Sequence, residues 1–332
     1  MKHTIKTFFT FALALALFGI TACKGPSDNN SGGTDEGVRP WTAELTLSSD
    51  TLGIKVTVTT DDGTPVTVED CTETELKSGT ATDLHANGTR VKLTGKITGL
   101  SCGSNKLTGL NVQGGVNALT TLRCNDNKLA ALDMHGCTDL TGLSCDGNEQ
   151  LTSLNVQGCT ALTNLSCQNN GLSSLDVHGC TALGSLRCDE NKLISLNVQG
   201  CTALNELWCQ KNQLTELNVQ GLSALQRLGC SENQLTALDI HGLSALRHLS
   251  CDSNQLNAQV FTKIFTDLPQ RDAGANADCI LYTERTNVTE GNHKDFTSAS
   301  APQNLKDAFQ NAKTVKNWKM YKKNMNEDLW YI

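Results

Sequence analysis

Leucine recurs between residues 97 and 256 in a fixed frame in which apolar and polar positions alternate over short runs. The frame reads L-x-x-L-x-C-x-x-N-x-L and is followed by a similar half that ends x-x-L-[N/D]-V-x-G-C. Eight copies follow one another at spacings of 21 or 22 residues. Alternation of this kind is typical of short strands, and the turn residues within each half exclude a long amphipathic helix. The pattern predicts eight coils, each made of two short extended segments.

One repeat cannot bury its apolar stripe alone, so consecutive coils are expected to stack. Stacked strands lie ~4.8 Å apart, which gives the eight coils a length of roughly 40 Å. Two one-residue insertions interrupt the period, at Gly114-Gly115-Val116 and at Glu149-Gln150. Each insertion should bulge from a turn and leave the inward positions undisturbed.

This period and spacing resemble the leucine-rich repeat family. The similarity is to its bacterial, internalin-like branch, with cysteine where leucine is common, and it covers about half of the chain. The resemblance implies a mainly β solenoid that recognises a protein or a host surface through its strand face, without catalysis and without a cofactor.

Asparagine follows the central cysteine by three residues in every repeat. An amide side chain both donates and accepts, so it can satisfy backbone groups that the adjacent turn leaves unpaired. Buried polar groups must be paired, which favours a structural ladder over a ligand-binding role. The ladder consists of Asn105, Asn127, Asn148, Asn170, Asn191, Asn212, Asn233 and Asn254.

Residues 1–22 have the basic start and short apolar run of a targeting segment, too short to span a bilayer comfortably. The run ends in Ile20-Thr21-Ala22-Cys23, which resembles a bacterial lipobox and implies lipid attachment at Cys23. Ordinary secretion with cleavage after small residues is the alternative. Residues 23–39 are rich in Gly, Ser, Asn and Asp and are expected to form a flexible tether.

Lipidation would place the protein in the cell envelope, because more than one acyl chain gives stable anchoring. Lys24 stands where some lipoproteins carry an aspartate that retains them in the inner membrane, which favours the outer membrane. An acidic surface-export signal of the Bacteroidota type is only weakly represented, by Asp28, Asp35 and Glu36. The periplasmic and the outer face, that is the cell surface, therefore both stay open.

Segments of different character flank the repeats. Residues 40–96 alternate in the manner of β-strands around an Asp61-Asp62-Gly63 turn, and we expect a β-rich module that caps the solenoid; a separate ligand-binding module is the alternative. Residues 257–332 predict a C-terminal α/β cap. In that cap Asn257 begins one helix, a second covers 305–315, and aromatic residues seal the last coil: Phe261, Phe265, Phe309, Trp318 and Trp330.

Fifteen cysteines in an exported protein would ordinarily indicate disulfides. Most of them, however, form in-register inward columns, which do not suit the crossed geometry of a disulfide. The second column continues as leucine at Leu222 and Leu243, so it requires a compact apolar group. We expect buried free thiols, and no pair has the close spacing of a zinc site. The columns are Cys102, Cys124, Cys145, Cys167, Cys188, Cys209, Cys230 and Cys251, and Cys137, Cys159, Cys180 and Cys201.

The second half of each repeat contains either Asp-x-His or Asn-x-Gln. Because aspartate always accompanies histidine and asparagine accompanies glutamine, we expect the two side chains to form a hydrogen-bonded surface pair. His135 and His178 belong to coils two apart, so roughly 10 Å separates them, too far for one metal ion. The histidine pairs are Asp133/His135, Asp176/His178 and Asp239/His241.

Residues beside the inward leucine and cysteine point outward from the strands. In the early coils they are mostly small, such as Gly99, Ser101, Gly142 and Ser144, whereas in the later coils they are large and mixed. A tryptophan beside two arginines has the composition of an interface hot spot; an ordinary solvated face is the alternative. The candidate partner-binding residues are Arg187, Glu206, Trp208, Arg227 and His248.

The net charge of −7 makes phosphate-mediated nucleic-acid binding a poor fit. No G-x-S-x-G, H-E-x-x-H or Gly-rich phosphate motif occurs, and we predict a non-enzyme. The expected function is binding of a protein or host-surface partner by an envelope lipoprotein. A glycan- or nutrient-binding component of an outer-membrane uptake system and a purely architectural envelope protein are the alternatives.

Overall fold

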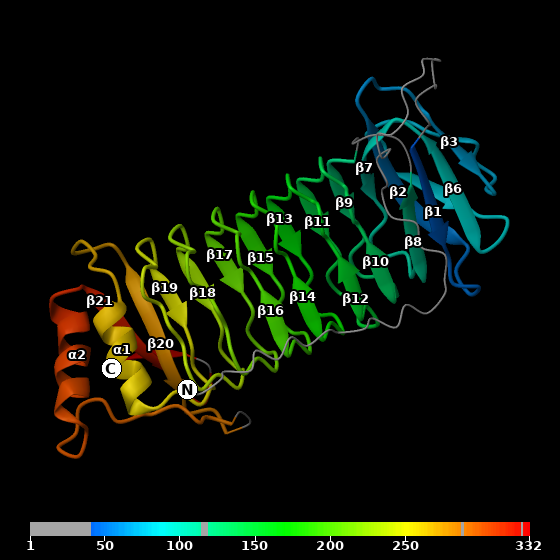
Figure 1. Ribbon diagram of the computed structural model, residues 1–332. Helices are drawn as coiled ribbons and strands as arrows, with labels where there is room; N and C mark the ends of the chain where they lie inside the picture. The colour runs from blue at the N-terminus through cyan, green and yellow to red at the C-terminus, as the bar shows by residue number, and fades with distance from the viewer. Residues whose placement is uncertain (1–40, 114–118, 287–288, 327) are drawn as a thin grey trace, which may run out of the picture.

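The computed structural model describes residues 41–113, 119–286, 289–326 and 328–332. Figure 1 shows an elongated stack of coils between a β-rich module at one end and a helix-bearing module at the other. Among the described residues, no helix has the length and apolar content needed to cross a membrane. The predicted signal segment, Cys23, the tether and the insertion at 114–116 lie outside the described residues.

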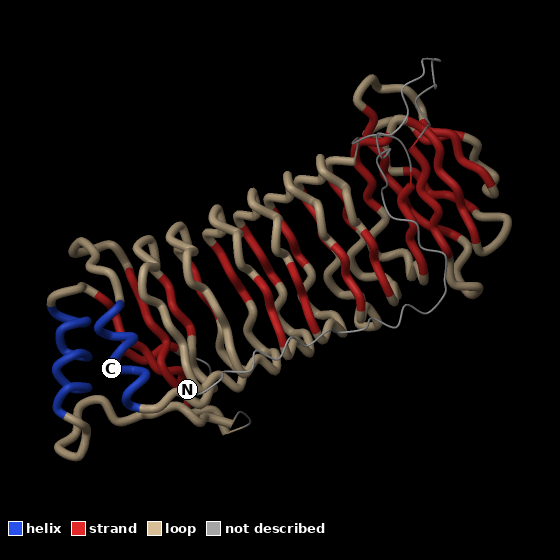
Figure 2. Tube along the Cα trace, in the orientation of Figure 1, coloured by secondary structure: helices blue, strands red, loops and turns tan. Residues whose placement is uncertain are grey.

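One long face of the stack is a parallel sheet with one strand from each repeat (Figures 1 and 2). Leucine pairs with leucine at every step, from Leu100↔Leu122 to Leu228↔Leu249. The eight strands bound seven complete turns of the chain. They are β7 (Ile97–Ser101), β9 (Thr121–Arg123), β11 (Gly142–Ser144), β13 (Asn164–Ser166), β15 (Ser185–Arg187), β17 (Glu206–Trp208), β18 (Arg227–Gly229) and β19 (His248–Ser250).

The second half of each repeat forms the opposite face. Four of these segments pair as parallel strands, with Leu132↔Leu154 and Leu175↔Leu196 in register. No strand is assigned after Asn197 on this face within the described residues, although Leu217 and Leu238 stay buried there. The strands of this face are β8 (Gly109–Gln113), β10 (Ala131–Asp133), β12 (Ser153–Asn155), β14 (Ser174–Asp176) and β16 (Ser195–Asn197).

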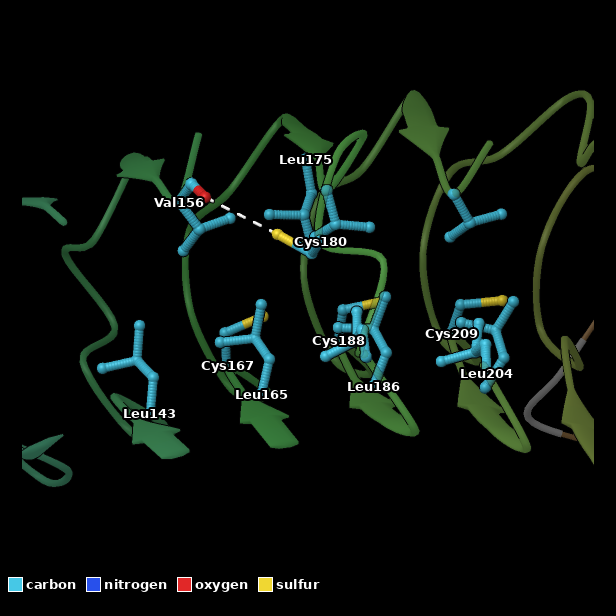
Figure 3. Packing of buried hydrophobic residues seen from close by; sticks show 14 of the residues in the cluster. Leu143, Val156, Leu165, Cys167, Leu175, Cys180, Leu186, Cys188, Leu204 and Cys209 are labelled. Atoms are coloured by element: carbon cyan, nitrogen blue, oxygen red, sulfur yellow. Dashed lines mark hydrogen bonds between the residues drawn. The ribbon is translucent and has the colours of Figure 1, made fainter. Parts of the chain in front are cut away.

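Leucine, valine and cysteine side chains from both faces fill the space between them, and Figure 3 shows four successive coils of this core. Leu186 and Cys188 are both fully buried. Glu149 and Gln150 at the second insertion are exposed, whereas Leu151 is fully buried. That insertion therefore bulges outward and leaves the inward column unbroken.

The N-terminal module continues both faces of the first coil. Its β1 pairs with β8, and its β2 pairs antiparallel with β7. The open apolar end of the stack is thus covered by strand pairing on each side. The module consists of β1 (Trp41–Thr46), β2 (Gly53–Thr60), β3 (Val66–Glu69), β4 (Glu75–Leu76), β5 (Thr82–His85) and β6 (Arg90–Gly95).

The C-terminal module extends the parallel sheet and adds two helices. Asn257 caps the first helix by accepting a hydrogen bond from Val260 N. Phe261, Phe265, Phe309 and Phe296 form one cluster with ring centroids 5.1–5.7 Å apart. The elements are α1 (Ala258–Asp267), β20 (Ala277–Thr283), α2 (Gln303–Thr314), β21 (Trp318–Lys323) and β22 (Leu329–Tyr331).

These features confirm the predicted fold class, a leucine-rich repeat β-solenoid between two caps. One detail of the C-terminal cap was wrong. Trp318 is buried as expected, but 56% of Trp330 is exposed, so it does not seal the last coil. Phe296, which stands in a segment without regular secondary structure, takes that place in the aromatic cluster.

Candidate functional site

The asparagines of the repeat hold neighbouring coils together. Asn191 Nδ2 donates to Cys167 O (2.9 Å) and Cys188 O (3.2 Å), which belong to two successive coils. Its Oδ1 accepts from Leu172 N at 3.1 Å. One amide therefore satisfies three backbone groups that no strand pairing serves. The repeat asparagines are 0–8% exposed. Their side chains therefore hydrogen-bond the backbone and are not accessible to a ligand.

Both ends of this ladder are closed by the caps. At the first coil, Asn105 exchanges two hydrogen bonds of 2.8 Å with the backbone of Lys55 in β2. Beyond the last coil, Asn292 donates to Cys251 O at 2.8 Å and accepts from Leu256 N at 2.8 Å. Asn292 thus adds a rung from outside the repeat. The sequence pattern could not reveal it, because Asn292 does not follow the repeat spacing.

The cysteines of both repeat columns lie inside the coil. All fourteen cysteines of the described residues are free thiols. Burial raises the pKa of Cys167 and Cys188 well above its ordinary value. In the second column, Cys201 Sγ donates to Val177 O at 3.3 Å, and Cys180 does the same to Val156 O (Figure 3). Thiols of the second column therefore also bond one coil to the previous one. The leucines that continue this column, Leu222 and Leu243, had suggested an apolar role alone.

The candidate partner-binding residues lie on four consecutive strands of the parallel sheet. Arg187 on β15 is opposite Trp208 on β17, and Trp208 is opposite Gly229 on β18. A Cβ atom at Gly229 would lie 2.5 Å from Trp208 Cε3. The indole therefore lies directly on the Gly229 backbone, and only glycine leaves it that space. Its ring centroid is 5.6 Å from that of His248.

Ion pairs fix the charged residues beside this ring. Arg227 pairs with Glu206 across adjacent strands, and 55% of the Arg227 side chain is exposed. His248 Nδ1 lies 2.8 Å from Asp278 Oδ2 in β20. Arg187 Nε is 3.6 Å from Asp189 Oδ1, and burial raises the pKa of the Asp189 carboxyl while Arg187 opposes that shift. The structure therefore brings all five predicted residues together, in a pre-ordered mixed-charge arrangement around one aromatic ring.

We call this set, Arg187, Glu206, Trp208, Arg227 and His248, the late-coil patch. The corresponding positions of the early coils are occupied by Gly99, Ser101, Gly142 and Ser144, and a large exception is the exposed Arg123 of β9. Two contributors were missed at the sequence level. Gly229 carries no side chain to suggest contact, and Asp278 lies in the cap, 30 residues from His248.

The Asp-x-His segments do not form the side-chain pair that we predicted. Asp176 Oδ1 accepts from the backbone N of His178 at 2.9 Å, and Asn197 Oδ1 accepts from Gln199 N at 3.2 Å. This is a local Asx turn, which needs only the first residue of each pair. The His178 ring instead approaches Gln199 O of the next coil, with Nδ1 at 3.1 Å.

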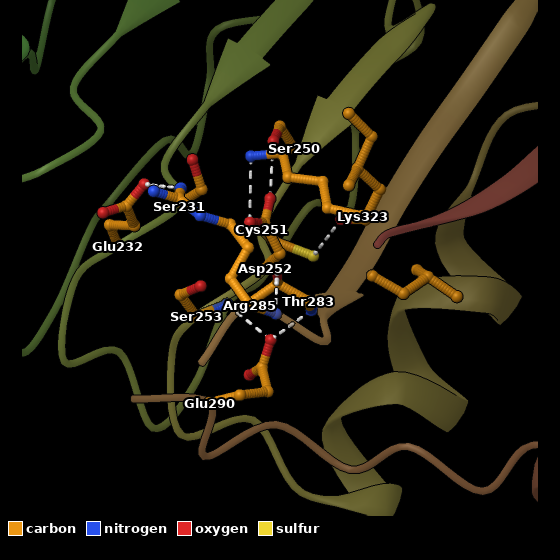
Figure 4. A network of polar contacts seen from close by, with 12 residues as sticks. Ser231, Glu232, Ser250, Cys251, Asp252, Ser253, Thr283, Arg285, Glu290 and Lys323 are labelled. Carbon is orange, nitrogen blue, oxygen red and sulfur yellow. Dashed lines mark hydrogen bonds and ion pairs between the residues drawn. The ribbon is translucent and has the colours of Figure 1, made fainter. Parts of the chain in front are cut away.

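The last two coils are joined to the C-terminal module by partly buried polar contacts (Figure 4). Lys323 Nζ lies 3.0 Å from Asp252 Oδ2. Glu290 accepts backbone hydrogen bonds from Ser253 N (2.9 Å) and Thr283 N (2.6 Å). Arg285 pairs with Glu232 at 3.3 Å. In the part of the chain that the structure describes, no group of three or more His, Cys, Asp or Glu is placed to hold a metal ion.

The comparisons with known proteins return similar solved structures only. No family model matches the chain, and no curated protein matches it. One similar structure is the functional domain of InlJ from Listeria monocytogenes, which includes a cysteine ladder. Its TM-score is 0.41 at 28% identity, over 57% of this chain and 51% of that one. Another is YopM, a leucine-rich effector protein from Yersinia pestis, with a TM-score of 0.40 at 22% identity, over 48% and 50%. The chain therefore matches only about half the length of each.

Proposed function

We propose that this protein is a non-catalytic scaffold that binds a partner protein through the late-coil patch. The observation that supports it is the contrast along one sheet: the inward columns repeat in all eight coils, whereas the outward residues, Arg123 apart, are small in the early coils and become large and charged in the later ones. Stacking alone requires nothing of the outward side. A rigid aromatic ring with arginines beside it is the composition that dominates binding energy in protein interfaces.

The geometry favours a pre-formed contact surface. Trp208 is held by Gly229 beneath it and His248 beside it, so little side-chain freedom is lost on binding. The Glu206–Arg227 and His248–Asp278 pairs are set across adjacent strands, and paired charges of this kind give orientation and specificity more than affinity.

The test uses a soluble form that begins at Lys24, first to capture a partner and then to measure its affinity. Trp208→Ala should weaken binding of the captured protein by at least about tenfold, as loss of a hot-spot tryptophan does. Arg123→Ala is the matched control, because Arg123 occupies the equivalent outward position of an early coil; it should change affinity less than about twofold. Equal binding by the Trp208→Ala and wild-type proteins would contradict the proposal, as would binding to glycans alone.

We further propose that lipid on Cys23 anchors the scaffold to the outer membrane, with residues 23–39 as its tether. The lipobox-like Ile20-Thr21-Ala22-Cys23 supports this assignment. Cys23→Ala should move the protein from the detergent phase to the aqueous phase in a phase-partition assay, because stable anchoring requires the acyl chains. Unchanged partitioning would refute the anchor.

A further inference from the structure

The parallel sheet ends at β22, and the outer edge of this strand is open. Among the residues that the structure describes, β22 pairs only with β21, in antiparallel orientation. Hydrogen bonds from Asn324 N to Asp328 O and from Ile332 N to Met320 O, each 2.9 Å, fix which residues face β21. Since bonded and non-bonded pairs alternate along an antiparallel ladder, Leu329 and Tyr331 direct their N–H and C=O groups away from β21. No described residue bonds these four groups.

Apolar side chains surround this open edge. The exposed fractions are 47% for Leu329, 56% for Trp330 and 60% for Tyr331. Single exposed apolar residues are ordinary, but a contiguous run on an unpaired strand is a template for another chain. The edge therefore combines unsatisfied backbone groups with apolar area that a bound strand would cover.

The segment that leads to β22 is rich in positive charge, although Asp328 directly precedes Leu329. Residues 308–326 contain five lysines and no acidic residue. Lys313 Nζ lies 4.7 Å from the centroid of the Tyr331 ring, and Lys322 Nζ lies 5.6 Å from that of Trp330. Lys322 pairs with Glu284, and Lys319 Nζ bonds Asn276 Oδ1 on the β20 side at 3.1 Å. Lys313 Nζ bonds Ile332 O at 2.6 Å and has no aspartate or glutamate partner among the described residues.

We propose that the outer edge of β22 binds an extended, acidic segment of a partner protein, which adds to the sheet as a further strand. Backbone pairing would supply affinity and alternate side chains specificity, while glutamate or aspartate would meet Lys313, which lies beside the Tyr331 ring. This site is separate from the late-coil patch and does not depend on it.

The same charges decide between this partner and two other occupants. A second copy of the chain, paired β22 to β22, would bring the lysines of both copies together, and like charges placed opposite each other are destabilising. An anionic membrane would meet the lysines and aromatic rings, but it cannot satisfy the four backbone groups, which cost several kcal/mol each in hydrocarbon. Of the three occupants, only an acidic strand would both meet the lysine charge and hydrogen-bond the four backbone groups.

The probe is an acidic peptide of about ten residues in which glutamate alternates with valine or threonine, a usual strand length. Leu329→Pro removes one outward N–H without breaking the pairing with β21. Leu329→Ala is the matched control, because it removes the same side chain and keeps the N–H. Peptide affinity should fall at least about tenfold in the proline variant relative to the alanine variant, and the Leu329 and Tyr331 amides should become protected from hydrogen exchange in the wild-type complex.

Lys313→Glu should bind the acidic peptide more weakly than the wild type and bind a lysine-substituted version of it more tightly. Equal peptide affinity of the proline and alanine variants, or no binding to the wild type, would overturn the proposal. So would a dimer at rising protein concentration that Leu329→Pro abolishes, which would identify a second copy as the occupant. Adsorption to anionic vesicles that both Leu329 variants share, without peptide binding, would identify a membrane.

Discussion

Leu207 and Trp208 are neighbours in β17 but belong to opposite sides of the sheet. Leu207 is fully buried and pairs with Leu186 and Leu228 on the adjacent strands, and every coil repeats it. Trp208 points outward between Arg187 and Gly229, and no other coil has an equivalent ring. Coil stacking fixes the inward side completely and leaves the outward side free to differ, so the outward differences are where function is expected.

Removing one rung of the inward ladder should have the largest effect. In Asn170→Ala, Asn148 N loses its acceptor at 2.8 Å, and the carbonyls of Cys145 and Cys167 lose a donor. We expect the free energy of unfolding to fall by about 1–3 kcal/mol, the cost of orphaned buried backbone groups. Urea denaturation measures it, with the outward Ser166→Ala as control at about 0.5 kcal/mol or less. Equal effects of the two substitutions would erase the distinction between the sides.

The turns show the same contrast on a smaller scale, because their backbone repeats while their solvent-facing side chains vary. Ser104 has a φ of +59° and Gly179 has a φ of +88°, with open space around its Cβ position. Left-handed backbone costs an L-residue roughly 1–2 kcal/mol. Ser104→Gly should therefore stabilise slightly, by about 0.5–1 kcal/mol, and Gly179→Ala should destabilise by about 1 kcal/mol.

Thermal unfolding of the two variants checks both signs. A stabilising Gly179→Ala, or a destabilising Ser104→Gly, would show that the shared backbone conformation does not control these turns.

The inward side could be predicted from the sequence because it repeats. The frame identified the buried leucines, cysteines and asparagines, and helical spacing placed α1 and α2 to within a few residues. Local signals sufficed because each coil contacts mainly its neighbours. The left-handed turn two residues after each central cysteine stayed hidden, since that position holds residues as different as Ser104, Lys211 and Glu232.

The contacts that could not be predicted involve residues outside the repeat frame or positions where the frame gives no signal. Asn292 extends the ladder from an irregular segment of the cap, and His248 contacts Asp278 in β20. The alternation of inward and outward positions correctly placed Trp208 on the outward side of the sheet. Nothing in the sequence indicated that its ring would lie on the backbone of Gly229. The predicted side-chain contact within the Asp-x-His pairs was wrong for a different reason. Two residues that always occur together suggested a mutual contact, while a backbone turn explains the aspartate alone.

If the inward side sets stability and the outward side sets binding, two variants should separate these properties when affinity for the captured partner and urea stability are both measured on each. Trp208→Ala should lose affinity at least about tenfold and change the free energy of unfolding by no more than about 0.5 kcal/mol. Asn170→Ala should lose about 1–3 kcal/mol of stability and keep wild-type affinity wherever it is folded. If both variants lost affinity and stability in parallel, the separation of the two sides would be contradicted.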